Sequence, residues 1–85
     1  MRIALDYDGT YTRAPALWDA FIASAEQHGV DVVCVTMRRP EEAVEIGCPV
    51  HYTDREAKLF WCARRGLQID VWIDDMPQYI VGDAR

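Results

Sequence analysis

The chain is 85 residues long, which is the length of one small domain with a single core. Apolar residues make up 51% and charged residues 27% of it, a composition typical of a folded globular protein rather than a disordered one. The formal net charge of −5 argues against general binding to nucleic acid or to an anionic membrane, because phosphate contacts need basic patches. We therefore expect residues 1–85 to form a single domain.

The hydropathy pattern argues against membrane and secreted classes. The longest strongly apolar run, residues 32–35, is far shorter than the roughly 20 residues that a membrane helix needs. Asp6 interrupts the first apolar stretch too early for a signal peptide. The sequence has three cysteines and no Cys-x-x-Cys motif, so we expect Cys34, Cys48 and Cys62 to be free thiols. The sequence thus predicts a cytoplasmic protein without a membrane segment.

The first half of the chain alternates strand and helix patterns. Residues 2–6 predict a short strand, and the Asp-Gly-Thr sequence within residues 7–14 indicates a loop. Residues 15–28 place apolar side chains at spacings of three and four after Pro15, which predicts an amphipathic helix that ends at the following glycine. Residues 31–36 are rich in valine and predict a strand buried on both faces.

The second half repeats the alternation. We expect a short helix over residues 40–46 and a third strand over residues 48–52. The sequence Thr53-Asp54-Arg55-Glu56 matches a capping box, which predicts a helix from there to about Arg65. Residues 69–73 alternate apolar and polar side chains as a strand does, and one helical turn is expected after Pro77. This order predicts a parallel α/β sheet with right-handed crossovers.

Polar side chains follow each predicted strand. In open α/β sheets, ligands bind outside the carboxyl ends of the strands, so these side chains are candidates for a common site. They are Asp6 and Asp8 after the first strand, Thr36, Arg38 and Arg39 after the second, Lys58 after the third, and Asp74 and Asp75 after the fourth.

The charges of this set favour a metal and a phosphate. If the first and fourth strands are neighbours, four carboxylates meet and repel one another strongly. A hard divalent cation such as Mg²⁺, which prefers oxygen ligands and substrate phosphate, relieves that repulsion. Thr36 offers a hydroxyl donor and Lys58 a point charge to a phosphoryl group.

The ordered set Asp6-x-Asp8-Gly9-Thr10, Thr36, Lys58 and Asp74-Asp75 resembles the four motifs of the haloacid dehalogenase superfamily. The resemblance spans residues 2–76, and its first motif, preceded by Ile3-Ala4-Leu5, is the most specific. It implies a minimal Rossmannoid three-layer sandwich of about four parallel strands in the order 3-2-1-4, with helices on both faces. No cap domain fits between the motifs.

The resemblance also implies a role for each motif residue. Asp6 would be the nucleophile that forms an aspartyl-phosphate, and Asp8 the general acid and base. Mg²⁺ would be bound by the side chain of Asp6, the backbone carbonyl of Asp8, and Asp74, Asp75 or both. The substrate phosphate would be bound by Thr36, Lys58, Gly9 and Arg38.

These roles predict a Mg²⁺-dependent phosphohydrolase acting on a small phosphomonoester, with a nucleotide or a nucleic-acid end suggested by Arg38 and Arg39. An alternative is a non-catalytic module that binds Mg²⁺ and phosphate and acts through a partner, because the cap is absent and few residues follow the fourth motif. A receiver domain is a third reading, although its motifs run in a different order. Thr36 as a plain strand residue and Lys58 as a solvated partner of Asp54 are the simpler interpretations.

The content of three tryptophans in this short chain is high. Their side chains are expected in the core or at a subunit contact, so a homo-oligomer is an open expectation, and it would also cover a sheet edge.

Overall fold

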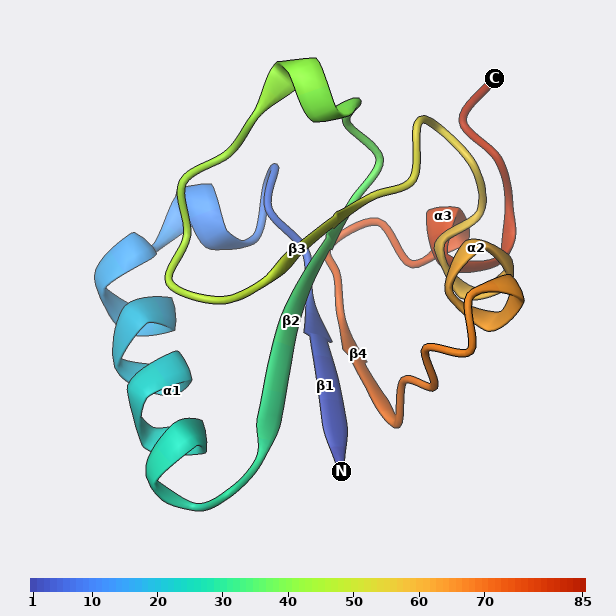
Figure 1. Cartoon of the computed structure of the whole chain (residues 1–85). Helices are drawn as coiled ribbons and strands as arrows, with labels where there is room; N and C mark the ends of the chain where they lie inside the picture. The colour runs from blue at the N-terminus through green and yellow to red at the C-terminus, as the bar shows by residue number, and fades with distance from the viewer.

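The computed structural model describes all residues from Met1 to Arg85 and is an α/β sandwich (Figure 1). Its four strands are β1 (Arg2–Leu5), β2 (Asp31–Thr36), β3 (Val50–Tyr52) and β4 (Val71–Ile73). Its three α-helices are α1 (Pro15–Gln27), α2 (Lys58–Arg64) and α3 (Gln78–Val81), and two short 3₁₀ helices are η1 (Tyr11–Arg13) and η2 (Pro40–Glu42).

The sheet is entirely parallel and has the strand order β3-β2-β1-β4, which confirms the predicted fold class. In the register of its central strands, Leu5 of β1 faces Cys34 of β2 and Ile73 of β4. The backbone N–H of Asp6 then donates to the carbonyl of Ile73 at 2.9 Å, so the residues that follow β1 and β4 lie side by side.

Helices cover both faces of the sheet, with α1 on one side and α2 and α3 on the other (Figure 1). Because successive side chains of a strand point to opposite faces, the sheet contributes to two cores. The core under α1 contains Ile3, Leu5, Ile22, Ala25 and Val32. The core under α2 contains Ala4, Val33, Val35 and Cys62.

The predicted helix over residues 40–46 is wrong beyond its first turn. Only η2 forms, and residues 43–49 run without regular structure to β3. The tyrosine hydroxyl of Tyr52 accepts a hydrogen bond from the backbone N–H of Val44 at 3.1 Å. In this non-helical path Ile46 and Cys48 pack against the core under α1, which is a stronger constraint than the helix propensity of so short a segment.

The predicted capping box at residues 53–56 is also wrong, because α2 begins only at Lys58. Asp54 and Arg55 have φ angles of 51° and 69°, which are left-handed rather than helical. The hydroxyl of Thr53 donates to the carbonyl of Glu56 at 2.9 Å, and the backbone N–H of Ala57 donates to the Asp83 carboxylate at 2.7 Å. These contacts form a turn, which we call the 53–56 turn.

The remaining elements agree with expectation, although β3 and β4 each begin two residues later than the predicted strands over residues 48–52 and 69–73. The cysteines Cys34, Cys48 and Cys62 are free thiols. None of the helices combines the length and the apolar character that crossing a bilayer requires.

Candidate active site

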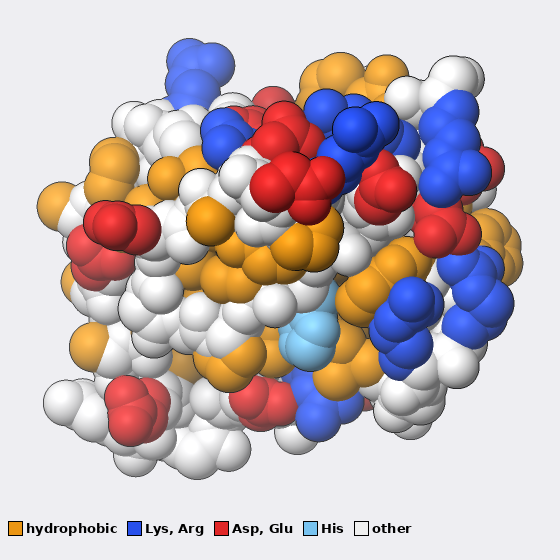
Figure 2. All heavy atoms as spheres, turned by 45° about the horizontal axis from the view of Figure 1, so that its top comes forward, with side chains coloured by type: hydrophobic (Ala, Val, Ile, Leu, Met, Phe, Trp, Pro, Cys, Tyr) orange, Lys and Arg blue, Asp and Glu red, His pale blue; other side chains and the backbone are white.

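A cleft of about 280 Å³ lies at the carboxyl ends of the strands. Acidic and basic side chains crowd together at this end of the molecule (Figure 2). The cleft brings together seven of the eight predicted site residues, and Gly9 lies against one of them. The lining residues are Asp6, Asp8, Thr36, Met37, Arg38, Arg55, Lys58, Asp74, Asp75, Met76, Tyr79 and Ala84.

A somewhat larger cavity of about 360 Å³ lies between α2 and the β4 edge. Its lining is mostly apolar and includes Leu59, Leu67, Ile69 and Trp72. The Cys62 thiol is its one titratable side chain, and burial raises the pKa of that thiol. The groups capable of chemistry therefore belong to the smaller cleft and not to this cavity.

The floor of the cleft is a buried ion cluster around Lys58. The Lys58 ammonium lies 2.7 Å from Asp6 Oδ1 and 2.6 Å from Asp74 Oδ2. All three side chains are nearly inaccessible, with exposed fractions of 4%, 9% and 3% for Lys58, Asp6 and Asp74. The simpler interpretation of Lys58 as a solvated partner of Asp54 is therefore wrong, because a buried lysine needs carboxylates to offset the loss of water.

Thr10 joins the two acidic motifs. Its hydroxyl oxygen lies 3.0 Å from Asp6 Oδ2 and 3.1 Å from Asp75 Oδ1, and it accepts the backbone N–H of Asp75 at 3.2 Å. A hydroxyl has one proton, so it donates to only one of these two carboxylates at a time. The other carboxylate oxygen then lies beside the hydroxyl oxygen with no proton between them, and a nearby cation would stabilise that arrangement.

The acidic cluster has the donor chemistry of a hard cation. Asp6, Asp74 and Asp75 each offer a carboxylate oxygen, and the three oxygens lie within 4.8 Å of one another. With Lys58 counted, the formal charge of this group is −3 + 1 = −2. All the candidate ligands are oxygens and the charge matches a divalent ion, so the residues fit Mg²⁺.

Asp74 and Asp75 differ in what already engages them. Asp74 Oδ2 accepts from Lys58, and its Oδ1 accepts from the backbone N–H of Met76 at 3.0 Å. Asp75 has only Thr10 as a side-chain partner. The carboxylate of Asp75 is therefore the freer ligand, whereas Asp74 caps the turn before α3 and holds Lys58.

The first loop places Asp8 away from the ion cluster. Both oxygens of Asp8 accept hydrogen bonds at 2.8 Å from the Arg38 guanidinium, which lies over the Tyr7 ring. This bidentate pair lowers the pKa of Asp8. Asp8 lies on the cleft wall, but its carboxylate is not part of the acidic cluster in this structure.

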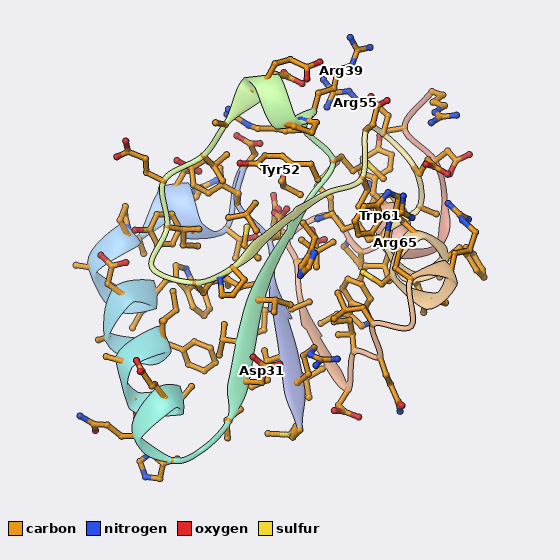
Figure 3. All side chains as sticks on the ribbon, viewed as in Figure 1. Asp31, Arg39, Tyr52, Arg55, Trp61 and Arg65 are labelled. Atoms are coloured by element: carbon orange, nitrogen blue, oxygen red, sulfur yellow. The ribbon has the colours of Figure 1, made fainter.

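Thr36 and the neighbouring arginines occupy different positions. Thr36 is 1% exposed, lines the cleft, and its hydroxyl accepts the backbone N–H of Arg38 at 3.3 Å. Arg39, which follows, is outside the cleft lining and pairs with Asp54 at 2.9 Å. Figure 3 shows Arg39 and Arg55 at the end of the molecule where the strands finish.

The sequence interpretation missed three contributors. Thr10 belongs to the first motif, but its contact with Asp6 has no signal in the sequence beyond the spacing of four residues. Arg55 lies in the sequence that predicts a helix start, which gives no sign that it lines the cleft. Tyr79 of α3 reaches the cleft from the tail, and no pattern indicated that contact.

Gly9 is required by the close approach of Asp75. Its φ is 84°, and a methyl group in its place would overlap the Asp75 carboxylate, whose Cγ would lie at 2.9 Å. We expect Gly9→Ala to lower the free energy of unfolding by about 1–3 kcal/mol, since the backbone is strained and the Asp75 carboxylate must turn away from its contact with Thr10.

Gly29→Ala is the matched control for that variant, measured by urea denaturation. Gly29 has a similar φ of 70°, but nothing lies within 4 Å of its added methyl group. We expect a loss of about 1 kcal/mol from strain alone. Equal losses in the two variants would contradict the collision with Asp75.

The buried position of Asp6 predicts a pH dependence of stability. Burial raises the pKa of Asp6 from 3.8 to about 6, against the attraction of Lys58. Burial alone would lower the pKa of Lys58, but the facing carboxylates of Asp6 and Asp74 raise it.

Between pH 3.8 and about 6, folded Asp6 retains a proton that the unfolded chain releases. The stability contributed by Asp6 is therefore greatest at the low end of this window and falls as the pH rises through it. Urea denaturation of the metal-free protein and of Asp6→Asn should show this fall only in the wild type. Parallel pH profiles would contradict the raised pKa.

No family model matches the chain, and neither the curated proteins nor the solved structures include a significant match. The protein is therefore described by its own fold and site: a parallel α/β sandwich with a carboxylate–lysine cluster at the carboxyl edge of its sheet.

Proposed function

We propose that the protein is a Mg²⁺-dependent phosphomonoester phosphatase and a compact member of the haloacid dehalogenase superfamily. The observation that carries the proposal is the buried cluster of Asp6, Lys58 and Asp74 beside Asp75, at the edge of a sheet where ligands bind. Burying these charges costs desolvation free energy that their pairing offsets only in part, and their place beside an open cleft supports a functional role for them.

Asp6 is the proposed nucleophile. One of its carboxylate oxygens forms a bond to phosphorus while the bond from phosphorus to the leaving oxygen breaks, which gives an aspartyl-phosphate and an alcohol. Asp8, protonated once it has left the Arg38 pair, gives its proton to the leaving oxygen and then takes one from the water that attacks phosphorus. Inorganic phosphate and free Asp6 result, so protons and bonds balance over the two steps.

The remaining polar groups hold the phosphoryl group and the ion. Lys58 and Thr36 line the cleft beside Asp6 and present an ammonium and a hydroxyl to phosphoryl oxygens. Asp6 and Asp75 are the proposed side-chain ligands of Mg²⁺, with the Asp8 backbone carbonyl beside them. When bound, the ion supplies positive charge that offsets the repulsion between substrate phosphate and carboxylates.

The proposed phosphatase acts on a small phosphorylated substrate in the cytoplasm. A cleft of about 280 Å³ lies just below the size of pockets that enclose drug-sized ligands, so it suits a small phosphorylated substrate. A second copy of the chain that covers the open site is compatible with this proposal, although no contact in the single chain argues for it.

Phosphate release from a panel of phosphomonoesters tests the proposal. The panel contains p-nitrophenyl phosphate, sugar phosphates, nucleotides and a phosphorylated oligonucleotide. We expect release with Mg²⁺ and a loss of about 100-fold or more when EDTA removes the ion, because the acidic cluster then repels the substrate phosphate. Release that is indifferent to EDTA would contradict the Mg²⁺ site, and no release from folded protein would favour the non-catalytic module.

A further inference from the structure

The Arg38 side chain, at the mouth of the cleft, is held by three hydrogen bonds and a contact with an aromatic ring. Its Nε and Nη2 each donate to Asp8 at 2.8 Å, and its Nη1 donates to the carbonyl of Glu42 at 3.3 Å. The guanidinium carbon lies 5.3 Å from the centre of the Tyr7 ring. These contacts orient a planar fork that matches an anion with two oxygens on one edge, which is the geometry of a carboxylate or a phosphate.

Arg55 reaches the same wall from the 53–56 turn. Its left-handed backbone is uncommon for a non-glycine residue and is held by bonds from its N–H and its Nη1 to the carbonyl of Met37, at 2.9 and 2.8 Å. Its Nη2 has only a loose ionic partner, Glu42 Oε1 at 3.6 Å. Strained backbone that directs a charged side chain into a cleft is a feature of binding sites.

The pair between Arg38 and Asp8 conflicts with the proposed reaction. Asp8 must reach the leaving oxygen of the substrate, yet Arg38 holds both of its carboxylate oxygens. If Arg38 binds another anion in place of Asp8, Asp8 is released and the guanidinium keeps an anionic partner. The transferring phosphoryl group lies deeper, at Lys58, whose side chain is 4% exposed against 33% for Arg38. The exchanging anion is therefore a second one.

We propose that Arg38 and Arg55 bind a second phosphate of the substrate at the mouth of the cleft, and that this exchange frees Asp8 to act on the first. The inference rests on the proposed phosphatase function and specifies its substrate class. That class is a phosphomonoester with a neighbouring phosphate group. A nucleoside 3′,5′-bisphosphate and the 5′-phosphorylated end of an oligonucleotide share this chemistry.

Arg38→Ala gives the sharpest test, because its effects on two substrates have opposite signs. In the wild type we expect kcat/KM for adenosine 3′,5′-bisphosphate to exceed that for adenosine 5′-monophosphate by about tenfold or more. In Arg38→Ala the bisphosphate value should fall by about tenfold or more, since charged hydrogen bonds are lost. The monophosphate value should rise by roughly two- to fivefold, because Asp8 is no longer held in an exposed ion pair.

Two further variants test the specificity of the Arg38 effect and the role of Arg55. Arg39→Ala is the matched control, since Arg39 pairs with Asp54 outside the cleft lining, and both substrates should keep wild-type rates. Arg55→Gly removes the second guanidinium while the positive φ is kept without strain. It should lower the bisphosphate rate without raising the monophosphate rate, because Arg55 does not hold Asp8.

A 5′-phosphorylated dinucleotide distinguishes the two sources of the second phosphate. If it is hydrolysed faster than the bisphosphate, the substrate is a nucleic-acid end, and the reverse order assigns a small molecule. Equal rates for monophosphate, bisphosphate and dinucleotide in the wild type would overturn this inference but would still support the proposed phosphatase function. A monophosphate rate that falls in Arg38→Ala would overturn the release of Asp8.

If no substrate is hydrolysed, calorimetry still tests whether a second phosphate binds at Arg38. The probes are the same monophosphate and bisphosphate, added to Asp6→Asn protein with and without the Arg38→Ala change. Tighter binding of the bisphosphate that disappears with Arg38→Ala would retain the second-phosphate position while the proposed hydrolysis fails. Equal affinity of both probes would overturn the position itself.

Discussion

Replacing Asp6 by asparagine is expected to abolish phosphate release and to leave the fold intact. An amide cannot form the acyl-phosphate, and loss of a nucleophile costs about 10³-fold or more in rate. Asparagine has the same shape as aspartate, and its amide oxygen accepts from Lys58 while its NH2 donates to the Thr10 hydroxyl oxygen, whose proton then goes to Asp75. Lys58 also retains Asp74 as an ionic partner, so its buried charge remains compensated.

The measurement is phosphate release together with thermal unfolding, and Asp31→Asn is the control. Asp31 begins β2 at the end of the sheet opposite the cleft (Figure 3). Its side chain forms an ion pair with Arg2. That variant also loses one carboxylate, but it should keep the wild-type rate. Full activity of the Asp6→Asn protein would disprove the covalent mechanism.

Replacing Lys58 by methionine is expected to cause the largest loss of stability of any single change at the site. The variant leaves the carboxylates of Asp6 and Asp74 buried, close to each other and without a counterion. Breaking a buried ion cluster in this way costs about 3–5 kcal/mol, a large part of the stability of a domain this small. Urea denaturation at neutral pH without metal measures the loss.

Arg64→Met is the control for that experiment. Arg64 forms an ion pair with Glu56 on the surface of α2, where its side chain is 54% exposed. Exposed pairs contribute about 1 kcal/mol or less, so this loss of a cation should scarcely move the unfolding midpoint. If Lys58→Met and Arg64→Met lost the same stability, the cluster would not have the energetic weight that its burial indicates.

The parts of the site that follow strands could be predicted from the sequence. A regular alternation of strand and helix patterns implies parallel strands, and parallel strands end at one edge of the sheet. Asp6, Thr36 and Asp74 each follow a strand whose apolar pattern is strong, so their meeting depends only on strand order. The resemblance to a known family supplied that order, and the structure has it.

The parts that depend on contacts between loops could not be predicted in this way. The 53–56 turn has the local sequence of a helix start, but bonds from Thr53 to Thr36 and from Arg55 to Met37 select another conformation. Such bonds join residues far apart in sequence, and no local propensity reports them. The pair between Asp8 and Arg38 is of the same kind, since it links two loops 30 residues apart.

Lys58 is the only lysine in the sequence, and its burial has a consequence for covalent labelling. Acylating reagents need an accessible, unprotonated amine, whereas the Lys58 ammonium is enclosed and its pKa is raised by two carboxylates. Lys58 should therefore resist acylation in the folded protein, and its acylation would report that the cluster has opened.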